Sequence, residues 1–461
     1  MTELGDAINF YHSLLDDEIG IQSQAQLTRQ LHHRQLFFGE RPLCTVLRPR
    51  FVTASQYQLL QNAIRSVMPA FAKAHRAALS DPVFRAQFRL VDWEEELVQV
   101  DPGFREPSPT ARMDSFFVTE PEAATIGDLG EGLYFAEYNA ETPAATAYCD
   151  VLSEVFLPLP IMGAFQRRYE TRPLPGRHHV LHALLDAYRQ WGGRERPRIA
   201  ILDWREVPTY SEFMLFQDYF ASQDFECVIA DPRQLEYRDG QLLVDGITPV
   251  QLIYKRVLLS ELVSREGLDS PVIRAVREHA VCMANPFRCK LLHKKSSFAV
   301  LSDEANAHLF SPEERLAIQR HIPWTRNVAE RRTAFHDQKI DLLPYASSHK
   351  DDFVLKPNDE YGGKGIVLGW ETDQTQWEIA LKAALAEPSI IQERICVPSE
   401  PYPSLVEGHV QIYDRLIDTN PYIWYGDYIS GCLTRLSTVE LLNVTAGGGS
   451  VVPTFLIEKR S

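Results

Sequence analysis

The feature that most constrains the fold of this 461-residue chain is a glycine-rich segment between two short apolar runs. Phe353-Val-Leu precedes it and Ile366-Val-Leu follows it, a pattern that predicts a strand, a loop and a returning strand. Glycines let a backbone turn sharply, and successive backbone N–H groups can bind phosphate oxygens. The P-loop and the dinucleotide fingerprint instead lead from a strand into a helix. The pattern therefore favours a flexible hairpin that closes over ATP.

Two lysines add positive charge to this segment. Lys356 ends the first apolar run, and Lys364 lies among the glycines of the loop at residues 361–365. Ammonium groups placed there suit a polyphosphate ligand. An ordinary tight hairpin that contains lysines is the alternative interpretation.

Composition and charge exclude several classes of function. The chain is 45% hydrophobic and 24% charged, as in ordinary globular proteins, and its net charge of -15 argues against general binding of nucleic acids or anionic membranes. No apolar run approaches the roughly 20 residues that span a bilayer, and the N-terminus lacks the pattern of a secretion signal. The seven cysteines form no CxxC pair. We therefore expect a cytoplasmic protein whose partners are small molecules, and the sequence does not set its oligomeric state.

The spacing of apolar residues divides the chain into regions with different predicted secondary structure. Apolar residues recur with a helical period from Ser55 to about Ala78, and another helix is expected at residues 178–191. Short buried strands at residues 199–202, 227–230 and 251–254, with a helix at 212–221, predict a small and mostly parallel sheet. Further on, we expect a hairpin at 234–244, a helix at 374–386, a strand at 390–393, a loop at 398–403 and strands around Ile429 and Val451.

Two acidic motifs occur early in the chain. Glu137 and Asn139 lie two apart in a predicted strand, so their side chains project from the same face. Mg²⁺ favours such a set, since it takes one or two carboxylates and completes its shell with waters and phosphates. Arg112 and Asp114 have the same spacing; Asp114 would complete the metal site and Arg112 would neutralise a transferring phosphoryl group. A solvated strand end and a simple salt bridge are the respective alternatives.

Other candidate residues occur late. Gln392 and Glu393 close a strand and would lie near adenine and ribose, with a solvated strand end as the alternative. Arg435 and the glycine-rich loop at residues 443–450 are further candidates for anion binding. The chain contains no GxSxG, HExxH or GxxxxGK[ST] motif, which weighs against hydrolase, zinc protease and P-loop functions.

Taken together, these motifs resemble the ATP-grasp superfamily in its circularly permuted form, as in glutathionylspermidine synthetase-like proteins. The acidic motifs come first, and the lysine strand and glycine loop come last. The resemblance runs from about residue 110 to the C-terminus. It implies an α+β or α/β architecture, namely a circularly permuted ATP-grasp fold with a small pre-ATP-grasp α/β domain.

The resemblance also implies a division of the chain and of its site. We expect a mostly helical region at 1–110, the metal-binding half of the core at 111–195, a pre-ATP-grasp-like domain at 196–285, an ATP-binding lid at 286–400 and completing strands at 401–461. Mg²⁺ would be held by Asp114, Glu137 and Asn139, with Arg112 as the catalytic residue. The residues expected to contact ATP are Lys295, Lys356, Tyr361, Gly362, Gly363, Lys364, Gly365, Gln392, Glu393 and Arg435.

The expected activity is the ATP-dependent joining of a carboxylate to an amine through an acyl phosphate, with release of ADP and phosphate. The substrates would be a small-molecule or peptide carboxylate and an amine. Two alternatives stay open at this point, a non-catalytic or regulatory ATP-binding protein of the same fold and a small-molecule kinase.

Overall fold

The structure is a computed structural model that describes residues 2–118, 132–336, 338–439 and 449–460. The candidate loop at 443–450 lies outside the described residues except for its last two positions. Within the described ranges, no helix combines the length and apolar character needed to cross a bilayer.

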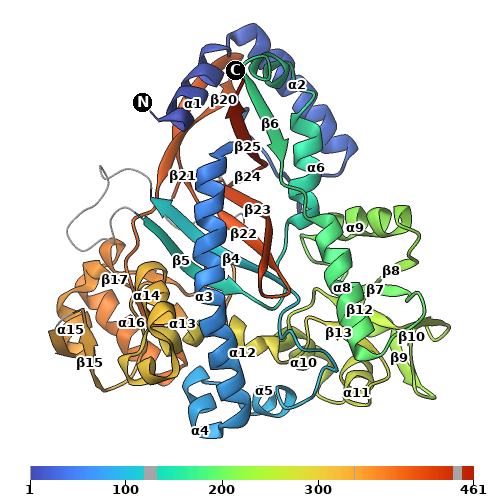
Figure 1. The fold of residues 1–461 in the computed structure, drawn as a ribbon, viewed down its shortest axis with the longest axis vertical. Helices are drawn as coiled ribbons and strands as arrows, with labels where there is room; N and C mark the ends of the chain where they lie inside the picture. The colour runs from blue at the N-terminus through green and yellow to red at the C-terminus, as the bar shows by residue number, and fades with distance from the viewer. Residues whose placement is uncertain (1, 119–131, 337, 440–448, 461) are drawn as a thin grey trace.

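A seven-stranded sheet forms the centre of the molecule (Figure 1). Its strand order is β20-β21-β23-β22-β4-β5, and β24 pairs with β23. Strands from the early and the late parts of the chain thus lie side by side, because β4 pairs with β22. The strands are β4 Thr110–Val118, β5 Gly132–Asn139, β20 Ser399–Val406, β21 His409–Ile417, β22 Asn420–Trp424, β23 Tyr428–Ser437 and β24 Ser450–Val452.

The β4–β5 hairpin separates an apolar face from a polar one. Met113 pairs with Tyr138, and both are buried in the cluster that includes α3 (Ala54–Ser80). The neighbouring residues of both strands project from the opposite face, since side chains alternate along a strand. A bulge between Asp114 and Ser115 shifts the pairing beyond that point. The long helix that the sequence predicted from Ser55 to about Ala78 is present as α3. It covers the apolar face of the β4–β5 hairpin (Figure 1).

A small parallel sheet occupies the lower right of Figure 1. Its order is β13-β12-β7-β8, with every neighbouring pair parallel, as the sequence predicted. Helices and a three-stranded antiparallel sheet, β11-β10-β9, flank it. These elements are α8 Arg177–Trp191, β7 Ile199–Leu202, α9 Tyr210–Ser222, β8 Cys227–Ala230, β9 Leu235–Arg238, β10 Gln241–Val244, β11 Thr248–Val250, β12 Leu252–Lys255, α10 Leu259–Glu266, α11 Pro271–Arg277 and β13 Cys282–Ala284.

The glycine hairpin belongs to a separate lobe at the lower left of Figure 1. Its antiparallel sheet has the order β14-β19-β17-β18, so the predicted strand–loop–strand and the following helix are confirmed. The elements of this lobe are α12 Cys289–His293, α13 Ser296–Ser302, α14 Pro312–His321, β14 Thr325–Asn327, β15 Arg332–Phe335, β16 Gln338–Asp341, α15 Leu342–Ser348, β17 Phe353–Pro357, β18 Val367–Leu368, α16 Gln374–Ala386 and β19 Ser389–Glu393.

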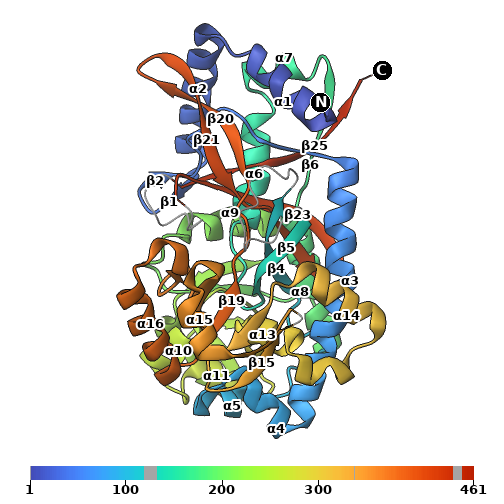
Figure 2. The ribbon, with the colours of Figure 1, turned by 90° about the vertical axis from the view of Figure 1, so that its left-hand side faces the viewer.

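The N-terminal helices and the C-terminal strand meet at the top of the molecule (Figures 1 and 2). There β25 lies between β3 and β6 in a three-stranded sheet. The elements in this upper part and between it and the core are α1 Glu3–Ser13, α2 Asp17–His33, β1 Phe37–Phe38, β2 Arg41–Pro42, β3 Arg50–Thr53, α6 Thr146–Phe156, α7 Pro160–Phe165, β6 Tyr169–Pro173 and β25 Thr454–Lys459. Two short helices, α4 Pro82–Arg85 and α5 Asp92–Leu97, lie instead at the lower end of the molecule (Figure 1).

One predicted element is wrong. The proline-rich segment at 398–403 was expected to be a loop, but most of it lies in strand β20. Pro401 and Pro403 are tolerated because β20 is at the edge of the sheet and pairs with β21 alone. An edge strand has one side on which no ladder hydrogen bonds are needed.

Candidate active site

A cavity of about 550 Å³ lies where the central sheet, the parallel sheet and the glycine hairpin meet. Eleven of the predicted site residues line it together, although they come from distant parts of the sequence. They are Arg112, Asp114, Glu137, Asn139, Lys356, Tyr361, Gly362, Gly363, Gln392, Glu393 and Arg435.

Asp114 lies between Arg112 and Arg435, and all three side chains line the cavity. Arg112 binds both of its carboxylate oxygens, at 2.6 Å through Nε and 3.2 Å through Nη2. Arg435 adds a contact of 2.7 Å and also holds Asp418 at 2.6 Å. Burial alone would raise the pKa of Asp114, but the two guanidinium groups hold it below its usual value. The salt bridge that sequence reasoning kept as an alternative is thus present, and Asp114 has little capacity left for a metal ion.

Glu137 lies opposite Asp114 on the paired strand, and Asn139 lies opposite Arg112. Lys295 donates to Glu137 Oε1 at 3.0 Å and to the Glu360 carbonyl at 2.6 Å. Burial opposes ionisation of Glu137, yet Lys295 keeps its pKa below the ordinary value. The amide nitrogen of Asn139 is buried and has no hydrogen-bond partner among the described residues. Only the Asn139 amide oxygen could bind a cation, because the unpaired NH₂ group is a hydrogen-bond donor. The Glu137 carboxylate and the Asn139 amide oxygen are nonetheless ligand types that suit Mg²⁺.

Lys356 extends from β17 toward the β4–β5 hairpin and lines the same cavity as Glu137 and Asn139. Its ammonium donates to Gln392 Oε1 at 2.6 Å and to the Ala136 carbonyl at 3.3 Å, and no described carboxylate pairs with it. Burial lowers the pKa of Lys356 to about 8, although Glu137 acts in the opposite direction. A half-buried ammonium that forms no ion pair with a described carboxylate is suited to receive an anionic ligand.

Gln392 and Glu393 are both buried at the end of β19. Gln392 also donates to Thr325 Oγ1 at 2.9 Å. Glu393 lies 2.8 Å from His336 Nε2, and its burial raises its pKa. The alternative of a solvated strand end is therefore ruled out for this pair, because both side chains are buried and line the cavity. Their place near adenine stays a prediction.

The glycine loop reaches across the cavity to the parallel domain. The Tyr361 hydroxyl donates to Glu261 Oε1 at 3.1 Å, and Glu261 Oε2 accepts from Trp204 Nε1 at 3.0 Å. Gly362, Gly363 and Gly365 all have positive φ. These contacts join the hairpin lobe to helix α10 over the cavity.

Three of the residues predicted to contact ATP are not brought to the cavity lining. The Lys364 side chain is 75% exposed and pairs with Glu360 at 3.0 Å. Gly365 lies against Pro357 at the base of the loop. Lys295 also lies outside the lining but contacts Glu137, as described above. The contact of Lys364 with ATP stays a prediction.

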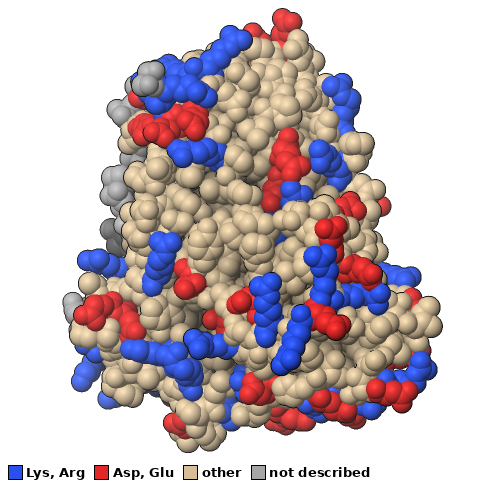
Figure 3. Space-filling model, turned by 45° about the vertical axis from the view of Figure 1, so that its right-hand side comes forward, with Lys and Arg blue, Asp and Glu red and all other residues tan. Residues whose placement is uncertain are grey.

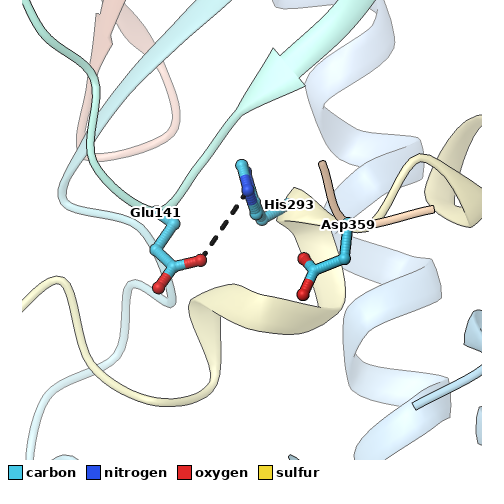
Figure 4. A group of neighbouring side chains, drawn as sticks. All are labelled: Glu141, His293 and Asp359. Atoms are coloured by element: carbon cyan, nitrogen blue, oxygen red, sulfur yellow. Dashed lines mark ion pairs between the residues drawn. The ribbon is translucent and has the colours of Figure 1, made fainter. Parts of the chain in front are cut away.

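Sequence reasoning missed a buried charge network below the loop (Figure 4). Glu141, His293 and Asp359 lie close enough to share a cation. The Lys290 ammonium already fills that role, at 3.0 Å from Glu141 Oε2 and 2.8 Å from Asp359 Oδ1. Burial lowers the pKa of His293 to about 4, so its ring is neutral near pH 7. The network ties the end of β5 to the first residues of the glycine loop. The acid at position 141, two residues beyond Asn139, was the signal that could have revealed it.

Charged side chains are spread over the face of the molecule drawn in Figure 3. On the face drawn in Figure 3, acidic and basic side chains are interspersed. The cavity itself is lined by three cationic side chains, those of Arg112, Lys356 and Arg435.

Comparisons with known proteins agree with this architecture. No protein-family model matches the chain. It is 23% identical over 285 residues to an uncharacterized protein of Mycobacterium leprae, covering 59% of this chain and 47% of that protein. It is 21% identical to a protein of Frankia casuarinae provisionally named glutamate–cysteine ligase 2-2, and 22% identical to the similarly named 2-3 of Frankia alni. Each match covers 95% of this chain and 50% of the relative. The chain thus spans about half the length of the curated relatives it matches.

A solved structure matches over nearly the whole length. It is a glutathione synthetase-like effector from Globodera pallida in its apo form, with a TM-score of 0.61 and 13% identity, covering 96% of this chain and 98% of the effector. The chain therefore has a glutathione synthetase-like fold. At the level of the fold, this match agrees with the resemblance to glutathione synthetase-like proteins. The resemblance drawn from the sequence is confirmed at that level.

Proposed function

We propose that this protein is an ATP-dependent ligase that joins a carboxylate to an amine, built on a circularly permuted ATP-grasp fold. The observation that carries the proposal is the convergence of Lys356, Glu137 and Arg112 on one cavity beneath the glycine loop. The names of the two Frankia relatives support ligase chemistry, although the chain spans only half of each.

The proposed reaction has two steps. A carboxylate oxygen of the first substrate attacks the γ-phosphorus of ATP, and ADP leaves. The amine of the second substrate then attacks the carbonyl carbon of the acyl phosphate, phosphate leaves, and the nitrogen loses a proton to give the amide. Phosphoryl transfer of this kind depends on positioning and on neutralising charge rather than on covalent help from the protein.

The side chains of the cavity suit these steps. Lys356 would bind phosphate oxygens, since its half-buried ammonium forms no ion pair with a described carboxylate. Arg112 and Arg435 would neutralise charge that develops during transfer. Glu137 and Asn139 would hold Mg²⁺, which supplies positive charge to the phosphates when bound. The loop that Tyr361 fastens to α10 would exclude water from the acyl phosphate.

The proposal is tested by calorimetric titration with the non-hydrolysable analogue AMP-PNP, with and without Mg²⁺. We expect magnesium-dependent binding that is lost in Lys356→Met and weakened in Glu137→Gln. Lys382→Met is the matched control, because Lys382 is exposed on α16 away from the cavity.

Turnover is then tested with pairs of acids and amines by measuring ADP and product. An amide with ADP and phosphate supports the ligase. A phosphorylated product without an amide would instead indicate a kinase. Normal ADP production by both site variants would show that the site is wrongly assigned.

A further inference from the structure

The parallel sheet reverses its order at one point beside the cavity. The chain passes from β7 to β8 on one side and later returns to β12 on the other side of β7. In open parallel sheets, ligands bind outside the carboxyl ends of the strands where the order reverses. Asp203 follows β7 and Arg256 follows β12, and the last residues of these strands, Leu202 and Lys255, are paired. Both following side chains line the cavity.

Arg256 has unused hydrogen-bonding capacity. Its side chain is buried, and its Nη2 donates to Glu212 Oε2 at 3.0 Å. Its Nε and Nη1 atoms have no hydrogen-bond partner among the described residues, and the guanidinium lies over the rings of Phe213 and Tyr254 at 4.9 and 5.6 Å. Unpaired buried donors are costly, and a planar guanidinium is well matched to a carboxylate. Arg256 is thus prepared to bind an anionic group.

Asp203 is the complementary group. One of its oxygens accepts from the Trp204 amide at 2.8 Å, and it forms no ion pair with a described residue. Its burial raises its pKa to about 6, although Arg256 acts in the opposite direction. Nearby charges are already engaged, because Lys255 binds Glu141 and Glu261 binds Trp204 and Tyr361. Asp203 therefore has an acceptor available for a ligand cation.

We propose that Arg256 and Asp203 form a subsite for an α-amino-acid head group, which carries a carboxylate and an ammonium on one carbon. Arg256 binds the carboxylate and Asp203 binds the ammonium. Phe38, Leu43, Val207 and Pro208 also line the cavity and leave an apolar surface for the rest of the molecule. This inference rests on the proposed function to the extent that the head group belongs to one of the two ligase substrates.

The test measures direct binding without nucleotide. The common L-α-amino acids are titrated into the full chain by calorimetry and by ligand-observed NMR. The tightest binder is then compared with its deamino and decarboxy analogues. We expect both analogues to bind about tenfold or more weakly, because each removes one charge-assisted contact.

Two variants and one control complete the design. Arg256→Lys keeps the charge opposite Glu212 but removes the planar donor set, and Asp203→Asn removes the acceptor charge. Both are expected to lower affinity by about tenfold or more while circular dichroism stays unchanged. Arg238→Lys, on the exposed hairpin strand β9, should bind as the wild type does.

The outcomes separate this inference from the ligase proposal. The subsite is overturned if no amino acid binds, if the analogues bind equally well, or if the folded variants bind normally. Selective amino-acid binding without AMP-PNP binding would remove the ligase and leave the subsite. Magnesium-dependent AMP-PNP binding without amino-acid selectivity would leave the ligase proposal standing and overturn the subsite.

Discussion

Arg435 reaches Asp114 across the central sheet, with 2.7 Å between Nη2 and Oδ2, although 321 positions separate them in the chain. Asp114 is thereby shared between an arginine of its own strand and one from β23. This sharing makes the early and late halves of the site depend on a single carboxylate.

We expect Asp114→Asn to lower the free energy of unfolding by about 3 kcal/mol near pH 7, because it leaves two buried arginines without their shared charge. The pKa of Asp114 is lowered in the folded state, so its contribution is present above its unfolded pKa and is lost as the pH falls through the folded value. Urea unfolding at about pH 7 and pH 3 measures both effects. Asp269→Asn, at an exposed position, is the control. Equal stability of Asp114→Asn and wild type at both pH values would contradict the assignment.

Nucleotide affinity should depend on the charge of Lys356. Burial lowers its pKa to about 8, so AMP-PNP binding should weaken as the pH rises from about 7 to 9. This loss does not reflect unfolding, since a lysine whose folded pKa is depressed destabilises the fold less as the pH rises. Lys356→Arg keeps its charge over this range and should bind with a flatter pH profile. A steep profile in that variant would assign the titration to another group.

Two glycines of the loop should respond differently to alanine. Both have positive φ, so each substitution strains the backbone by about 1 kcal/mol. An added Cβ at Gly365 would also lie 2.7 Å from Pro357 Cγ, whereas nothing lies within 4 Å of one at Gly362. We expect Gly365→Ala to be the more destabilising by about 1–3 kcal/mol in urea unfolding. Equal effects would mean that the base of the loop adjusts freely.

The contact between Tyr361 and Glu261 should hold the loop over the cavity. Tyr361→Phe removes a hydrogen bond worth about 0.5–1.5 kcal/mol. Hydrogen–deuterium exchange should therefore speed up in residues 358–366 while β17 and β19 stay protected. Tyr413→Phe, on exposed strand β21, is the matched control. Unchanged exchange in the loop would show that other contacts hold it.

Local patterns predicted much of the architecture. The period of α3, the buried strands of the parallel sheet and the glycine hairpin were all readable, because each depends on residues close together in the sequence. The proline-rich strand β20 was not, since its conformation depends on pairing at a sheet edge.

The residues that make up the site were easier to predict from the sequence than the contacts between them. Spacing indicated Arg112, Asp114, Glu137 and Asn139, but not that Lys295 would bind Glu137. Arg256 and Asp203 were missed because a strand-end charge has meaning only once the order of strands in the sheet is known. Long-range pairing decides these contacts, and no local pattern encodes it.

The alternation of faces in the β4–β5 hairpin also limits how this protein can misfold. A slip of one residue in either strand would turn its core residues outward and bury its charged ones against α3. Such a slip would therefore lower the stability of the fold, in addition to any effect on the site. The buried residues Met113 and Tyr138 therefore fix the alignment of the charged side chains on the opposite face of the hairpin.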